Sequence, residues 1–185
     1  FDWMTEDMLA KNKTWVKDWT SRAQGWRNEQ SANVSAFQFG SMPKEVNGSA
    51  DVVVFIRALH NLAYFENDGG YLTVALKDAH RALKPGGIVG IVQHMAPETA
   101  SDEWANGGNG YIKKSFVIAK MKAAGFEYVD SSDININPKD KPSENDGVWR
   151  LPPSFSNSKD KPELKKEYIA IGESTRMTLM FRKPK

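Results

Sequence analysis

The sequence predicts an α/β fold with a mainly parallel sheet and helices on both faces, and three observations carry that prediction. Residues 51–57 (DVVVFIR) form an apolar run rich in β-branched residues, which is typical of a strand buried on both faces of a parallel sheet. Apolar residues then recur at helical spacing over residues 69–84. After Pro85-Gly86-Gly87 ends that helix, residues 88–92 form a second apolar strand. Strands that alternate with helices of this length indicate βαβ units.

The other elements follow from the same kinds of pattern. Thr5 is a plausible helix N-cap, and the apolar stripe behind it includes Trp15, Trp19 and Trp26. Period-two alternation and turn residues predict the strands, and helical spacing with a terminal Gly125 predicts one further helix. The predicted elements are one or two helices at 5–27, a strand at 33–39, a helix at 111–124, and strands at 126–136 and 174–182.

A polar, proline-rich stretch at residues 137–166 separates the last two strands. Connections within compact domains are commonly about 2–6 residues long, so a stretch of this length is more often a functional loop than a spacer. We expect a long loop or lid that packs Trp149 over a ligand, and the alternative is a mobile surface loop.

Composition excludes several classes of protein. The 185 residues are 40% hydrophobic, which suits a single domain with a sizeable core. The 25 basic and 23 acidic residues are mixed along the chain, so no face for nucleic acid is predicted. No apolar run approaches the roughly 20 residues of a membrane span, which predicts a soluble protein, cytoplasmic or periplasmic. Without cysteine there is no disulfide and no thiolate chemistry.

Polar residues follow both central strands, at the edge where open parallel sheets bind ligands. Arg57, His60 and Asn61 come directly after the first strand, and His94 follows the second. Each histidine is either a general base, because imidazole titrates near neutral pH, or a hydrogen-bonded structural residue. Their spacing predicts no metal site. Residues 107–110 (GGNG) lack a strand directly before them, which favours a hinge or the approach to a helix over a phosphate-binding turn.

The two central segments resemble a known family. Residues 51–61 and 81–94 (RALKPGGIVGIVQH) are similar to the fourth and fifth strands of class I S-adenosylmethionine-dependent methyltransferases, in which the LKPGG corner is a frequent signature. Residues 123–126 (AAGF) and 180–184 (MFRKP) look like those of a bacterial group of predicted methyltransferases. The resemblance covers the chain from about residue 33 onward.

That resemblance implies a Rossmann-like sheet with the strand order 3-2-1-4-5-7-6. Residues 33–39 would be strand 3, residues 51–57 strand 4 and residues 88–92 strand 5. Strands 1 and 2, which carry the family's glycine-rich turn and ribose-binding acidic residue, have no counterpart in this sequence. Because unpaired strand edges are unfavourable, we expect a segment upstream of Phe1 or another chain to fill the gap, unless the sheet is rearranged.

The resemblance also implies a cofactor, S-adenosylmethionine, and a small-molecule methyl acceptor. His60 and His94 would be catalytic. The cofactor would contact the adenine-side residues Phe39, Gly40, Ser41 and Met42, and also Arg57, Ala58 and Leu59. The acceptor would contact Asn61, Tyr64 and Trp149. Ser41 stands where many members of the family carry an aspartate.

Two interpretations of the whole chain stay open. One is an enzyme, a methyltransferase whose site an N-terminal segment completes. The other is a non-catalytic, methyltransferase-like fragment or degenerate domain that acts as a binding module. A homo-oligomer is open in both.

Overall fold

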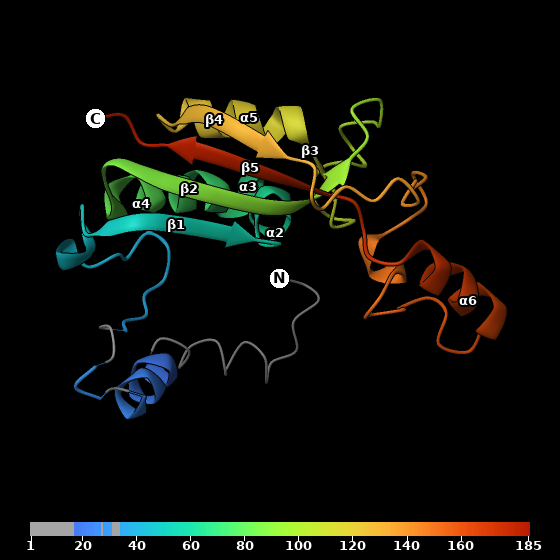
Figure 1. Cartoon of the computed structure of the whole chain (residues 1–185), viewed down its shortest axis with the longest axis horizontal. Coiled ribbons are helices and arrows are strands. Elements are labelled where there is room, and N and C mark those ends of the chain that lie inside the picture. The colour runs from blue at the N-terminus through green and yellow to red at the C-terminus, as the bar shows by residue number, and fades with distance from the viewer. Residues whose placement is uncertain (1–16, 27, 31–33) are drawn as a thin grey trace. The chain divides into compact units, whose positions relative to one another are not determined.

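A computed structural model describes residues 17–26, 28–30 and 34–185, and the chain divides into two units after Lys44 (Figure 1). In the first unit, residues 17–25 are helical, and the rings of Trp19 and Trp26 meet edge to face with 5.6 Å between their centroids. The predicted helix at 5–27 is therefore present over this part, and residues 5–16 lie outside the described residues.

The predicted strand at 33–39 is wrong over its described part. Residues 34–39 have no strand conformation, and Asn33 lies outside the described residues. Alternating polarity stabilises a strand only when a neighbouring strand pairs with its backbone and a core covers its apolar side. Val34 and Phe39 are both exposed, so this pattern is not matched by burial.

The second unit contains one sheet with short helices. Its elements are η1 (Lys44–Val46), β1 (Ala50–Ile56), α2 (Leu59–Tyr64), α3 (Glu66–Gly69), α4 (Tyr71–Ala82), β2 (Leu83–Ala96), β3 (Ile112–Lys113), α5 (Lys114–Ala123), β4 (Glu127–Ser132), η2 (Val148–Arg150), α6 (Pro162–Ile171) and β5 (Arg176–Arg182). The strands and helices predicted from residue 51 onward correspond to β1, α4, β2, α5, β4 and β5. Their ends shift by a few residues, and β2 is much longer than the predicted 88–92.

The sheet is mixed, with the order β1-β2-β5-β4 and with β3 beside the end of β2 (Figure 1). β1 and β2 run parallel, with Val53 opposite Val89, whereas β5 is antiparallel to both β2 and β4. This order matches strands 4, 5, 7 and 6 of the expected arrangement. Among the described residues no strand pairs with the other edge of β1.

The Pro-Gly-Gly corner lies near the start of β2, shortly after the end of α4, and is a point of close backbone approach. Gly86 has a φ of 80°, in the left-handed region that favours glycine. A Cβ atom on Gly87 would lie 2.9 Å from the carbonyl oxygen of Lys84 and 3.2 Å from that of Asp51. The side chains of Lys84 and Asp51 also form an ion pair at 2.7 Å. The corner thus holds the start of β2 against the start of β1.

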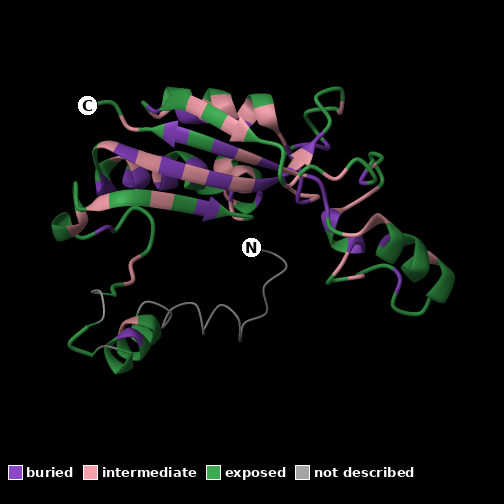
Figure 2. Cartoon of the chain, viewed as in Figure 1, coloured by how far each residue is buried: buried purple, intermediate pink, exposed green. Residues whose placement is uncertain are grey.

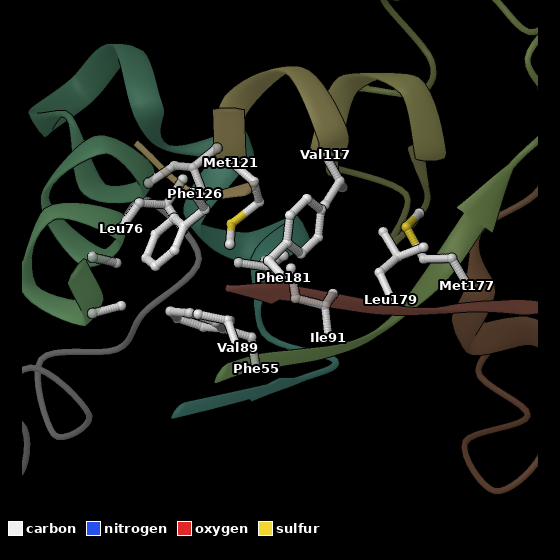
Figure 3. Packing of buried hydrophobic residues seen from close by; sticks show 14 of the residues in the cluster. Phe55, Leu76, Val89, Ile91, Val117, Met121, Phe126, Met177, Leu179 and Phe181 are labelled. Atoms are coloured by element: carbon white, nitrogen blue, oxygen red, sulfur yellow. The ribbon is translucent and has the colours of Figure 1, made fainter. Parts of the chain in front are cut away.

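The hydrophobic core lies on one face of this sheet (Figure 3). Alternate residues of β1, β2 and β5 pack there against apolar residues of α2, α4 and α5. The core residues include Phe55, Val89, Ile91, Met177, Leu179 and Phe181 from the strands and Leu59, Leu76, Val117 and Met121 from the helices. The sequence predicts helices on both faces of the sheet. In this unit α2, α4 and α5 cover one of those faces.

The opposite face of β1 is exposed. Val52, Val54 and Ile56 are 58%, 59% and 60% exposed, whereas Phe55 between them is buried (Figure 2). We call these three residues the β1 apolar stripe. Its composition suits a covered strand, but its surroundings in this unit leave it open to solvent.

The stretch predicted as a loop at 137–166 ends in helix α6, which includes residues 162–166. Pro162 and Glu163 suit the first turn of a helix, since proline presets the backbone angle and an acidic residue complements the helix dipole. Tyr168 is its one buried residue, so the apolar periodicity that would predict a helix is faint.

None of the helices in residues 17–26, 28–30 and 34–185 combines the length and the apolarity that a membrane crossing requires.

Candidate functional site

The two histidines that follow the central strands lie side by side. His60 is in the first turn of α2, just after β1, and His94 is near the end of β2. Their ring centroids are 5.7 Å apart, and the ring planes are inclined by 59°. Because β1 and β2 are adjacent and parallel, the polar residues after each strand meet at one edge of the sheet, as the sequence predicts.

A tight turn carries the chain from β1 into α2. Arg57 has a φ of 53°, which is unusual for a residue other than glycine, and its N–H donates to the carbonyl oxygen of Val92 at 2.7 Å. Ala58 is the N-cap of α2. The turn sends the side chain of Leu59 into the core and brings His60 to the edge of the sheet. Leu59 is buried as a whole residue, and its contact with a cofactor stays a prediction.

His60 is buried and contacts Gln93, a fully buried residue of β2. Its Nδ1 atom lies 3.3 Å from Oε1 of Gln93. Burial lowers the pKa of His60, and the positive charge of Arg57 lowers it further, while the hydrogen bond with Gln93 acts in the opposite direction. The imidazole is therefore held in its neutral form near neutral pH.

His94 is more strongly perturbed. Burial lowers the pKa of His94 to about 3, together with electrostatic interactions with His60, Arg176 and Arg57 that disfavour a second positive charge. Its Nδ1 atom lies 2.6 Å from Oγ of Ser174, just before β5. A histidine with so low a pKa is a weak base, and its neutral ring suits hydrogen bonding to a ligand better than proton abstraction.

The glycine-rich segment at 107–110 packs tightly over His60. Gly107 has a φ of 104°, and a Cβ atom there would collide with the carbonyl oxygen of His60. A Cβ atom on Gly110 would likewise collide with the side chain of Val148. The segment leads into β3 and α5, which agrees with the predicted approach to a helix. It also packs against the backbone of His60 at the site.

A buried polar network anchors the long stretch beside the histidines. The carboxylate of Asp140 accepts hydrogen bonds from Nη2 of Arg150 at 2.8 Å, from the hydroxyl of Tyr111 at 3.0 Å and from the N–H of Thr175 at 2.9 Å. Nη1 of Arg150 donates to the hydroxyl of Tyr111 at 3.0 Å. The ring of Tyr111 is 6.2 Å from that of His94. Burial and the adjacent Asp140 carboxylate raise the pKa of Tyr111, so it stays a neutral phenol.

This network also holds Trp149 at the site. Its ring centroid lies 6.0 Å from that of His60, and the residue is 42% exposed. An aromatic face beside a neutral imidazole is a suitable surface for a planar ligand. Trp149 thus lies beside His60, and its contact with an acceptor stays a prediction.

The remaining predicted contacts belong to α2 and to the first unit. Asn61 and Tyr64 are exposed on α2, and Gly108 packs against the ring of Tyr64. Residues 39–42 belong to the first unit, where they form a turn in which the N–H of Ser41 donates to the carbonyl oxygen of Gln38 at 2.9 Å. The roles of Phe39, Gly40, Ser41 and Met42 toward adenine stay predictions.

Sequence reasoning missed five buried polar residues of the site: Gln93, Tyr111, Asp140, Arg150 and Ser174. Gln93 carried a usable signal, because an amide within a strand buried on both faces needs hydrogen-bond partners. The other four carried none, because their partners are distant in the sequence. In the described part of the chain no three His, Asp or Glu side chains gather as a metal site requires.

No protein-family model and no curated protein sequence matches this chain. Its structure is similar to that of the [4+2]-cyclase SpnF, with a TM-score of 0.53 and 19% identity over 91% of this chain and 62% of the cyclase. It is also similar to the MccD protein, with a TM-score of 0.52 and 14% identity over 91% of this chain and 75% of that protein.

A third similarity is to a structure of the complex between the Haloferax volcanii Trm112 methyltransferase activator and the putative methyltransferase. The TM-score is 0.50 and the identity 16%, over 90% of this chain and 68% of that chain. The fold is the Rossmann-like α/β fold of the class I methyltransferase type. The chain spans less than two thirds of the length of the cyclase.

Proposed function

We propose that this chain provides one half of a methyl-transfer site that moves a methyl group from S-adenosylmethionine to a small-molecule acceptor. The observation that carries the proposal is the pairing of His60 and His94, whose rings lie 5.7 Å apart beyond two adjacent parallel strands. Open α/β sheets bind their ligands at this edge. The methyltransferase-type fold supports the same assignment, although related folds host several kinds of reaction.

His60 is the better of the two candidate bases. Its pKa is lowered, yet it carries a hydrogen bond that favours its protonated form, whereas the pKa of His94 falls to about 3. S-adenosylmethionine, when bound, would supply the methyl group to an acceptor oxygen and would leave as S-adenosylhomocysteine. His60 would take the proton that the acceptor hydroxyl loses. His94 acts as a neutral hydrogen-bonding wall of the acceptor pocket.

The acceptor would lie between polar and aromatic groups. The ring centroid of Trp149 lies 6.0 Å from that of His60, with the two rings in an edge-to-face arrangement, and Tyr64 and Asn61 are exposed on α2. Placing the acceptor hydroxyl in line with the methyl group supplies most of the rate enhancement expected of such a site. A planar molecule with a hydroxyl group fits this surface best.

The cofactor would supply an electrophilic methyl group on sulfur. Arg57, Ala58 and Leu59 would face it, because they directly follow β1 at the edge where open α/β sheets bind their ligands. Phe39, Gly40, Ser41 and Met42 are proposed for the adenine. No glycine-rich turn follows an apolar strand in this sequence, so we propose that another polypeptide segment pairs with the free edge of β1 and supplies that part of the site.

Calorimetry with S-adenosylhomocysteine tests this proposal. The titration is run on the 185-residue chain and on the same chain extended by the residues encoded upstream of Phe1. We expect heat from the extended protein and little or none from the chain alone. If the extended protein gives no heat at millimolar ligand, the enzyme proposal fails.

A His60→Gln variant of the extended protein separates chemistry from binding. We expect methyl transfer to fall by about 100-fold or more, since general-base catalysis contributes roughly 10²–10⁴-fold, with the affinity for S-adenosylhomocysteine nearly unchanged. The matched control is His80→Gln, which alters a histidine of α4 outside the site. Equal activity in both variants would assign His60 a structural role.

A second candidate function is a non-catalytic binding module. The observation that favours it is the β1 apolar stripe, which lies beside an unpaired strand edge in this unit. Such an edge can accept a strand from a partner protein. Binding of a partner through β1, together with no heat from S-adenosylhomocysteine in any form of the protein, would favour this function over the enzyme.

A further inference from the structure

Gln93 is a buried amide that joins the two strand ends to the glycine-rich segment. It has no exposed surface, and it lies in β2 directly before His94. Its Nε2 atom donates to the carbonyl oxygen of Gly110 at 3.0 Å and, more weakly, to that of His94 at 3.5 Å. Its Oε1 atom accepts from the backbone N–H of His60 at 3.4 Å and contacts Nδ1 of the same residue at 3.3 Å.

These contacts determine which end of the amide is oxygen. A carbonyl oxygen accepts hydrogen bonds and cannot donate, so the atom facing Gly110 has to be nitrogen. A backbone N–H donates and cannot accept, so the atom facing the N–H of His60 has to be oxygen. The two requirements agree, and rotating the amide by half a turn would break both sets of contacts.

The amide orientation in turn determines the protonation of the His60 ring. An amide oxygen has lone pairs and no hydrogen, so the Nδ1 atom that contacts it has to carry the proton. We infer that Gln93 is a positioning residue, which holds the neutral His60 as its Nδ1–H tautomer and leaves an unprotonated Nε2 atom to receive a proton or a hydrogen bond from a ligand.

The surroundings of His60 favour the neutral form that this arrangement needs. The charged and titratable groups nearest to it are Arg57 of the preceding turn and His94 of β2, and neither is an anion that would stabilise an imidazolium. The ring of His60 also lies 6.0 Å from that of Trp149, which carries no charge. No carboxylate among the described residues makes a hydrogen bond or ion pair with this ring.

The glycine-rich segment packs closely against its neighbours on both sides of this arrangement. A Cβ atom on Gly110 would collide with the side chain of Val148, and one on Gly107 would collide with the carbonyl oxygen of His60. Gln93 therefore spans two backbone groups that the fold already holds in place. The role in catalysis rests on the proposed function, whereas the tautomer is a property of the chain itself.

Long-range ¹H–¹⁵N correlation spectra of the imidazole rings test the inference on the 185-residue chain without any ligand. The chain has 3 histidines, so single His→Gln variants assign each ring. At pH 7 we expect His60 to show one protonated nitrogen, Nδ1, and one unprotonated nitrogen, Nε2. An Nε2–H tautomer or a charged ring in the wild-type chain would overturn the inference, whatever happens in any variant.

Two substitutions at Gln93 add a second test. Gln93→Leu removes the acceptor, and we expect the His60 signals to move toward those of the Nε2–H tautomer. Gln93→Glu places a carboxylate beside Nδ1, and we expect the pKa of His60 to rise above its wild-type value, because the negative charge stabilises the imidazolium. Unchanged His60 signals in a folded Gln93→Leu or Gln93→Glu variant would contradict the positioning role.

Ser174→Ala is the matched control. It removes a side-chain hydrogen bond from the other ring, that of His94, so we expect the signals of His94 to move and those of His60 to stay. Calorimetry with S-adenosylhomocysteine does not depend on the tautomer, and the spectra do not depend on the cofactor. Failure of the methyl-transfer proposal and failure of this inference are therefore observed separately.

Discussion

The Nδ1 atom of His94 lies 2.6 Å from Oγ of Ser174, a residue 80 positions further along the chain. The antiparallel pairing of β2 with β5 makes this contact possible, because it places Arg176 opposite His94 and so brings the residues before β5 to the end of β2. The same end of the sheet receives His60 from α2. The candidate site is therefore assembled where three separate segments of the chain converge.

The burial of His94 predicts a loss of stability in acid. Its folded pKa of about 3 lies below its ordinary value of 6.5, so below pH 6.5 the unfolded chain takes up a proton that the folded chain does not. The stabilisation is complete above pH 6.5 and is lost progressively as the pH falls toward 3. Between pH 7 and pH 5 we expect His94 to remove about 2 kcal/mol from the free energy of unfolding, measured by urea denaturation.

A His94→Asn variant is the control for that measurement. It keeps a polar side chain but does not titrate, so its free energy of unfolding should fall less between pH 7 and pH 5 than that of the wild type. An equal fall in both proteins would show that His94 is not the group responsible.

The network of Asp140, Arg150 and Tyr111 predicts a large effect of charge removal. Asp140→Ala leaves the guanidinium of Arg150 buried without its closest carboxylate, and we expect a loss of about 3–5 kcal/mol in the free energy of unfolding. Tyr111→Phe removes a hydroxyl and should have a smaller effect, about 1–2 kcal/mol. Urea denaturation at pH 7 measures both.

An exposed ion pair provides the comparison. Glu163→Ala breaks the pair with Lys166 on the surface of α6, and we expect a change of less than about 0.5 kcal/mol. A similar small change on Asp140→Ala would mean that the Asp140 network is hydrated in solution.

The packing of the glycine-rich segment predicts a strong effect of a single methyl group. Gly107→Ala combines a backbone angle that disfavours alanine with a collision against the carbonyl oxygen of His60. Gly172→Ala has a similar positive φ, 84°, but its Cβ atom would meet nothing within 4 Å. We expect Gly107→Ala to lower the free energy of unfolding by about 1–3 kcal/mol more than Gly172→Ala does.

Thermal and urea unfolding of the two glycine variants measure this difference, and the imidazole spectra of Gly107→Ala show whether His60 is displaced. Equal destabilisation in the two variants would indicate that the segment moves away from α2 in solution.

The two faces of the β1–β2 pair predict opposite responses to the same substitution. Val89→Ala opens a cavity in the core, because Val89 has no exposed surface, and should cost about 2 kcal/mol of stability. Val54→Ala alters the β1 apolar stripe and should change stability by less than about 0.5 kcal/mol. Urea denaturation at several protein concentrations measures both.

The concentration series also tests for self-association. If Val54→Ala costs as much as Val89→Ala, and the cost grows with protein concentration, then a second copy of the chain covers the stripe. Such a result would support a homo-oligomer that uses this face.

Local patterns in the sequence predicted most of the second unit. The β-branched run of β1, the helical spacing of α4 and the Pro-Gly-Gly corner are signals that each segment carries by itself. Helix α6 was missed because its apolar periodicity is weak. The strand predicted at 33–39 failed because a strand depends on a partner, and alternation within one segment does not supply one.

The sequence by itself also determined that His60 and His94 would meet, because adjacent parallel strands end at the same edge of a sheet. Only the tertiary structure decided how each ring is held. Gln93 contacts His60 across 33 positions of sequence, Ser174 contacts His94 across 80, and Asp140 contacts Tyr111 across 29. Hydrogen bonds between such distant residues depend on strand pairing and loop packing, and no local pattern records which polar side chains the folded chain brings together.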